Sequence, residues 1–108
     1  MPTTLPTPVA AYLAAANAQD VDAVTACFDE AAVVHDEKHT RQGLAAIREW
    51  AATVSGQYHP VVEVLDVAQS DGRTVVAGRV AGNFPGSPVD LAYAFTLKDG
   101  RIARLEIA

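Results

Sequence analysis

The second half of the chain is a series of strand-like segments, and this feature constrains the fold most. Four stretches rich in valine and aromatic residues follow one another, at residues 58–69, 74–84, 89–98 and 102–107. Asp71-Gly72 and Asp99-Gly100 separate the members of two pairs, and Asp-Gly is a strong hairpin turn. Pro85-Gly86-Ser87-Pro88 interrupts the chain between the pairs and predicts a loop. We therefore expect two antiparallel hairpins.

The first half of the chain has the periodicity of helices. Thr7-Pro8 is a helix start, and Val9, Tyr12, Leu13 and Ala16 then recur on one face of a helix that runs to about Asn17. Tyr12 should therefore point to the interior.

Two further helices are expected downstream. Asp20 can cap a short one with the stripe Val21, Val24 and Phe28. A third contains Ile47 and Trp50 and closes at Ser55-Gly56, where glycine can take the left-handed conformation. Between them, residues 31–35 predict a short strand and residues 36–43 a polar loop.

Helices that precede a run of strands give a layered α+β fold, because no helices remain between the strands to make parallel crossovers. This pattern excludes a doubly wound fold. The length of 108 residues fits a single domain over residues 1–108. We predict three N-terminal helices packed on a curved antiparallel sheet that encloses a pocket.

Composition narrows the possible partners. The net charge is -5 and the lysines and arginines form no cluster, which argues against nucleic acid. The single cysteine, Cys27, cannot form an intrachain disulfide, and no apolar run is long enough for a membrane span. We therefore expect a cytoplasmic protein with no membrane partner.

Four local sequences lie along this order of elements: Tyr12-Leu13, residues 20–24, residues 28–36 and residues 43–50. With the order of elements, they resemble the nuclear transport factor 2-like superfamily. That group includes ketosteroid isomerases, limonene-epoxide hydrolases and SnoaL-like polyketide cyclases. The resemblance implies a cone-shaped α+β barrel around a hydrophobic pocket, and it covers nearly the whole chain.

The resemblance also implies roles for individual residues. Tyr12 resembles the first-helix tyrosine of ketosteroid isomerases that donates a hydrogen bond to the dienolate oxygen, and Asp36 falls where those enzymes carry the proton-shuttling carboxylate. The third catalytic group of ketosteroid isomerases is a carboxylic acid that an apolar setting keeps protonated near pH 7. Its place holds Ala92 without a gap or Tyr93 with one, which departs from the steroid isomerase pattern. The Asp, Arg and Asp pattern of limonene-epoxide hydrolases has no matching places.

Each candidate catalytic residue also has an ordinary structural interpretation. Asp36 is a general base at the end of a strand, or a solvated loop acid. His35 titrates near neutral pH but should face the side opposite to Asp36, because side chains alternate on a strand. Tyr12 and Tyr93 are oxyanion donors or buried aromatic packing residues.

The predicted pocket walls are aromatic: Trp50, Phe28, Phe84 and Phe95. The segment His35-Asp36-Glu37-Lys38-His39 carries possible metal ligands, but its spacing fits no established site, so we expect no metal. The chain has no glycine-rich phosphate loop or nucleophile elbow, and no cofactor is expected.

Two functions follow as hypotheses. The first is an acid/base enzyme, isomerase-like or cyclase-like, that acts on a small apolar carbonyl compound. The alternative is a non-catalytic ligand-binding or dimerisation module with the same pocket. In either case residues 61–69 and 91–97 are apolar on more than one face, which predicts a homodimer through the sheet. Arg79 and Arg104 should then lie at the rim of the dimer contact or pair with acidic residues.

Overall fold

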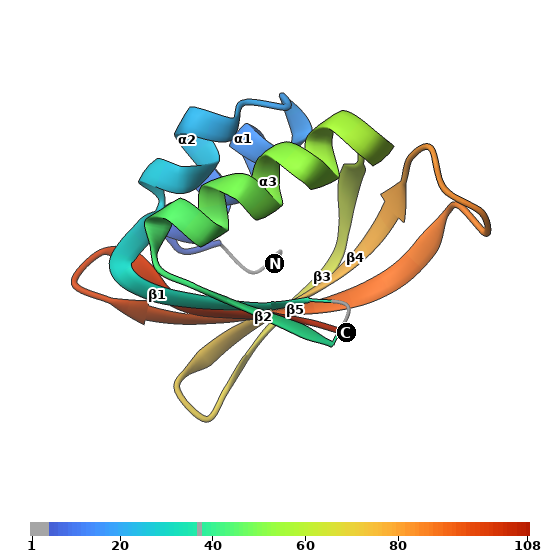
Figure 1. Ribbon diagram of the computed structural model, residues 1–108. Helices are drawn as coiled ribbons and strands as arrows, with labels where there is room; N and C mark the ends of the chain where they lie inside the picture. Colours follow the sequence, from blue (N-terminus) through green and yellow to red (C-terminus); the bar gives the residue numbers. More distant parts are fainter. Residues whose placement is uncertain (1–4, 37) are drawn as a thin grey trace.

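Within residues 5–36 and 38–108, which the computed structural model describes, three helices lie on one side of a six-stranded curved sheet (Figure 1). The helices are α1 (Thr7–Asn17), α2 (Val21–Ala26) and α3 (Leu44–Tyr58). The strands are β1 (Phe28–Asp36), β2 (His39–Gln42), β3 (Val61–Ser70), β4 (Arg73–Ala81), β5 (Val89–Lys98) and β6 (Arg101–Ile107). The predicted α+β class and its three-helix layer are confirmed.

The sheet has the order β2-β1-β6-β5-β4-β3 and does not close into a barrel. Strands β3 to β6 form the expected antiparallel meander. At both predicted turns the two residues have positive φ, with Asp71 at 52° and Gly72 at 76° in the first. This conformation is typical of the two-residue hairpin turns that Asp-Gly favours.

One strand pair differs from the predicted antiparallel sheet, because β1 runs parallel to β6. The expectation failed because the alternation of side chains along a strand shows which residues share a face, but not which strand pairs with it or in which direction. The crossover consists of β2, α3 and the strands β3 to β5, so it needed no additional helix.

Three local expectations are also corrected. Phe28 begins β1 instead of ending the stripe of α2. The segment predicted as a loop forms β2, which pairs with β1 and places Thr40 opposite His35. Helix α3 continues past Gly56 to Tyr58, whose ring packs edge to face on Phe84 at 5.9 Å. Its left-handed cap is His59, with φ of 46°.

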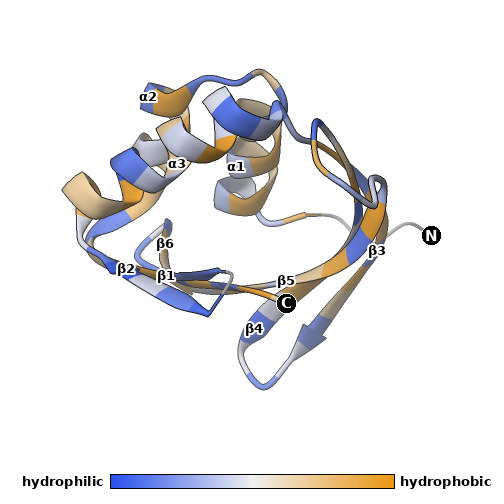
Figure 2. Ribbon diagram, turned by 45° about the vertical axis from the view of Figure 1, so that its right-hand side comes forward, coloured by the Kyte–Doolittle hydropathy of each residue, from blue (hydrophilic) through white to orange (hydrophobic). Residues whose placement is uncertain are grey.

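The core lies between the helices and the concave face of the sheet. Val9, Ile47, Val76, Ile102 and Leu105 are fully buried there. Figure 2 shows apolar stretches along β3 and β5 and on α1. In the described part of the chain, every helix is too short or too polar to cross a membrane.

Strand β3 is bent by a bulge between Val64 and Asp66. A bulge increases the local twist of a strand. The bend carries this edge of the sheet toward the helices, and Asn17 at the end of α1 fixes it there. The Asn17 amide exchanges two hydrogen bonds with the backbone of Val62, at 3.1 and 2.8 Å. This contact joins the helical layer to the sheet edge.

Candidate functional site

A cavity of about 510 Å³ lies between the helices and the concave face of the sheet. We call it the central cavity. Its size is typical of sites for small organic ligands. Residues of α1, α3, β3, β4 and β5 line it, and most of these side chains are apolar, with a few polar groups among them. Such a lining suits a mostly apolar ligand that carries few polar groups.

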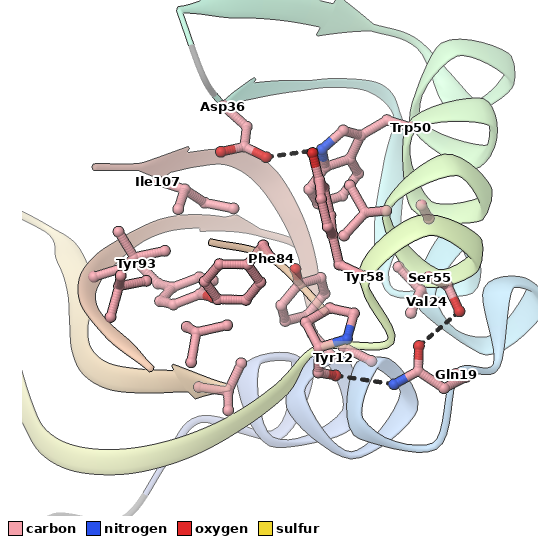
Figure 3. Close-up of a pocket in the computed structure, with 18 of the residues that line it drawn as sticks. Tyr12, Gln19, Val24, Asp36, Trp50, Ser55, Tyr58, Phe84, Tyr93 and Ile107 are labelled. Atoms are coloured by element: carbon pink, nitrogen blue, oxygen red, sulfur yellow. Dashed lines mark hydrogen bonds between the residues drawn. The ribbon is translucent and has the colours of Figure 1, made fainter. Parts of the chain in front are cut away.

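Asp36 lines this cavity from the end of β1. The indole N–H of Trp50 on α3 donates to Asp36 Oδ2 at 3.0 Å (Figure 3). This hydrogen bond fixes the carboxylate from one side, and among the described residues no group donates to Oδ1, so this oxygen can accept a proton. The helix and the strand thus hold an acid/base group at the wall of an apolar cavity.

His35 does not line the central cavity. Its Nδ1 is 2.8 Å from Thr40 Oγ1 on the neighbouring strand β2, whereas Asp36 reaches the cavity. Consecutive residues on a strand face opposite sides. The structure therefore gives no support for placing His35 in the site.

Tyr12 from α1 and Tyr93 from β5 line the cavity together with Asp36. Each is only 5% exposed. Burial, followed by the neighbouring Tyr93 and Asp36, raises the pKa of Tyr12 well above the usual tyrosine value. Burial and the negative charge of Asp36 also raise the pKa of Tyr93. Both phenols therefore stay protonated near neutral pH and can donate hydrogen bonds.

Of the four aromatic residues predicted as pocket walls, only Trp50 and Phe84 line the cavity. Phe28 and Phe95 are fully buried and lie behind Tyr12, so their placement in the pocket was wrong. Their rings pack edge to face on the Tyr12 ring at 5.9 and 5.5 Å. They support Tyr12 and do not touch the cavity because they are fully buried in the core, packed against the Tyr12 ring.

Three residues with polar groups that the sequence did not single out also line the cavity, and two of them, Gln19 and Ser55, lie on the side away from Asp36 (Figure 3). Gln19 follows α1, and Ser55 and Tyr58 belong to the last turns of α3. Ser55 donates to Gln19 Oε1 at 2.6 Å. The apolar stripe of α3 could have indicated Ser55 and Tyr58 if the helix had been extended past Gly56. Gln19 lies outside the helices and carried no signal.

In residues 5–36 and 38–108, no three His, Cys, Asp or Glu side chains come together in an arrangement that could hold a metal ion. Glu37, part of the segment with possible ligands, lies outside the described residues.

Residues 9–105 match the model of the SnoaL-like domain family. A solved structure of a candidate polyketide cyclase, protein SMa1630 from Sinorhizobium meliloti, is 43% identical. The match covers 96% of this chain and 95% of that one, with a TM-score of 0.92. A search among curated proteins found no match.

Two more distant structures have the same fold. SalBIII, an epoxide hydrolase/cyclase-like enzyme in pyran ring formation in the polyether salinomycin, is 25% identical over 94% of this chain and 86% of that one, with a TM-score of 0.82. A Catenulispora acidiphila protein with a ketosteroid isomerase-like fold, in complex with trimethylamine, is 18% identical over 97% and 86%, with a TM-score of 0.83. The two distant structures show a nuclear transport factor 2-like fold, and the family match across residues 9–105 with the 43% identical structure shows that the chain belongs to the SnoaL-like family.

Proposed function

We propose that this protein is an acid/base enzyme that moves a proton on a small, mostly apolar carbonyl compound. The observation that carries the proposal is the convergence of Asp36, Tyr12 and Tyr93 on one apolar cavity. A base and hydrogen-bond donors in one apolar site are the groups that enolisation requires. The family match and the likeness to a candidate polyketide cyclase support the same class of reaction.

Asp36 is the base in this proposal. Its Oδ1 takes a proton from the carbon next to the substrate carbonyl, and the electron pair of that C–H bond moves toward the carbonyl oxygen. The Trp50 hydrogen bond to Oδ2 holds the carboxylate while Oδ1 reacts. Positioning of this kind lowers the barrier because the reacting atoms need no further ordering.

Tyr12 and Tyr93 stabilise the negative charge that develops on the carbonyl oxygen. Their raised pKa values keep both hydroxyls protonated, so each can donate to an oxyanion and neither ionises first. Donors aimed at developing charge in a site of low dielectric are usually the largest catalytic contribution. The T-shaped packing of Phe28 and Phe95 on Tyr12 holds this donor in place.

The enolate then has two possible fates within the same site. Asp36 returns its proton to a different carbon, which gives an isomerisation. Alternatively, the enolate carbon attacks a second electrophilic carbon of the same molecule, which closes a ring, and the proton goes to the oxygen of that acceptor. Both outcomes use the same first step, so the proton abstraction is the part of the proposal to test.

Deuterium exchange into a simple ketone tests this first step without knowledge of the natural substrate. We expect the protein to exchange the α-protons of 2-decalone in D₂O, followed by NMR, faster than buffer and with saturation. Asp36→Asn should lower the rate by about 100-fold or more, the usual contribution of a general base. Exchange at the same rate with Asp36→Asn would show that Asp36 is not the base. Tight binding of the ketone without exchange would favour a non-catalytic binding module.

A further inference from the structure

Gln19, Ser55 and Pro60 form a hydrogen-bonded chain at the side of the central cavity away from Asp36 (Figure 3). Gln19 Nε2 donates to the backbone oxygen of Pro60 at 2.9 Å, and Ser55 Oγ lies 2.6 Å from Gln19 Oε1. All three residues line the cavity.

The direction of every hydrogen bond in this chain is fixed by chemistry. A backbone carbonyl oxygen can only accept, so the amino group of Gln19 must face Pro60. The amide oxygen of Gln19 then faces Ser55, and this oxygen also can only accept. Ser55 must therefore use its one hydrogen to donate to Gln19.

Toward a ligand in the cavity, Ser55 Oγ can therefore act only as a hydrogen-bond acceptor. A hydroxyl group has one hydrogen and two lone pairs, and the hydrogen is already committed to Gln19. Among the described residues, no group donates a hydrogen bond to Ser55 Oγ. A ligand group that bonds to Ser55 Oγ must bring its own hydrogen.

We propose that Ser55 is a second polar subsite, which accepts a hydrogen bond from a hydroxyl group of the substrate. This inference rests on the proposed function, because it takes the substrate carbonyl to lie near Asp36 and places a hydroxyl group at the other end of the substrate. It narrows the substrate class from an apolar ketone to a hydroxyketone.

Helix α3 sets the distance between the two polar ends. Trp50, which holds Asp36, and Ser55 both face the cavity from this helix, together with Val54 and Tyr58. Ser55 lies five positions after Trp50, which corresponds to about 7.5 Å along a helix axis. The wall between them is largely apolar. A ligand that reaches both ends therefore has an apolar frame, such as two fused rings, with its carbonyl and hydroxyl oxygens at opposite ends.

Three ligands with the same carbon frame test whether the ligand donates a hydrogen bond at Ser55 or accepts one there. They are 2-decalone, 6-hydroxy-2-decalone and 6-methoxy-2-decalone. Their binding is measured through the fluorescence of Trp50, the single tryptophan, which lies in the cavity wall. The expected result is that the hydroxy compound binds about 5-fold more tightly than 2-decalone, the gain of one neutral hydrogen bond. The methoxy compound, which cannot donate, should show no gain. This comparison within the unaltered protein needs no variant.

Ser55→Ala should remove the preference for the hydroxy compound and leave the affinity for 2-decalone within about 2-fold, because only the lost hydrogen bond separates the ligands. Thr53→Ala, which removes an exposed hydroxyl from the same helix, should keep the preference.

Two results would overturn the subsite. One is equal binding of the methoxy and hydroxy compounds, which would point to the second N–H of Gln19 as a donor. The other is an unchanged hydroxyl preference in Ser55→Ala. Loss of exchange activity with this preference intact would instead contradict only the proposed chemistry, since binding is measured without turnover.

Discussion

The indole N–H of Trp50 donates a 3.0 Å hydrogen bond to Asp36 Oδ2, and this contact joins the middle of α3 to the end of β1. It explains how a carboxylate at the end of an inner strand is held in the wall of an apolar cavity. The same indole forms part of that wall. Trp50 is therefore a positioning residue for Asp36 as well as a packing residue.

Trp50→Phe tests this positioning role. The phenyl ring keeps most of the packing but cannot donate to Asp36, so the carboxylate loses a fixed orientation. A hydrogen bond to a charged group contributes about 1.5 to 3 kcal/mol, so we expect kcat for 2-decalone exchange to fall at least about 10-fold with a smaller change in KM. Phe84→Leu, which alters the cavity wall without touching Asp36, should change KM more than kcat. The reverse pattern in the two variants would contradict the role of Trp50.

Truncation of Phe28 should lower the stability of the protein more than truncation of Phe84, because Phe28 is fully buried whereas Phe84 lines the cavity. Phe28→Ala should lower the free energy of unfolding by about 3 to 5 kcal/mol. Phe84→Ala should cost less, since its ring lines the cavity and is only partly buried. Urea unfolding of the two variants measures the difference. Equal losses would mean that Phe28 is not the deeper core residue that its burial indicates.

The buried phenols predict a loss of stability at alkaline pH. Burial raises the pKa of both Tyr12 and Tyr93 above the ordinary value of 10.0. Above that pH the unfolded chain releases these protons while the native protein still holds them. Stability is therefore fully present below pH 10 and falls as the pH rises through the native values. Urea unfolding between pH 9 and 11 measures the slope, which should become shallower in Tyr93→Phe. A slope unchanged by this substitution would exclude the explanation.

Exposed apolar side chains on β3 predict self-association through the sheet. Val61, Val64 and Leu65 are 49%, 39% and 45% exposed. Arg79 and Arg104 are paired with Asp90 and Glu106 at 3.0 and 2.8 Å, so their charges are partly neutralised.

We expect a symmetric dimer that buries at least about 1,000 Å², measured by light scattering at low micromolar concentration. Leu65→Lys should produce a monomer, whereas Ala10→Lys on the exposed surface of α1 should not. A monomeric unaltered protein would end this prediction.

Much of the fold could be predicted because its signals are local. Asp71-Gly72 and Asp99-Gly100 adopt the positive φ angles that their turn chemistry favours. The different directions of His35 and Asp36 follow from the alternation of a strand. The parallel pairing of β1 with β6 had no local signal, because its hydrogen bonds join segments about 70 residues apart.

The candidate site could be predicted only in part for the same reason. Asp36 and Tyr12 were recognised through a resemblance, not through their spacing. The contacts that define the cavity link distant positions: Trp50 with Asp36, and Ser55 with Gln19. Phe28 and Phe95 were misplaced because an aromatic residue on an inward face can line a cavity or fill the core, and the periodicity of the sequence is the same in both cases.

A double-substitution cycle tests most directly whether Asp36 and Tyr12 act on one substrate in one step. The four proteins are the unaltered chain, Asp36→Asn, Tyr12→Phe and the double variant, compared by kcat/KM for 2-decalone exchange. Each single substitution should cost about 100-fold, by loss of the base or of one oxyanion donor. Without the base no oxyanion develops for Tyr12 to stabilise, so the double variant should be little worse than Asp36→Asn. A loss in the double variant equal to the product of the single losses, or an unaffected Tyr12→Phe, would contradict the account.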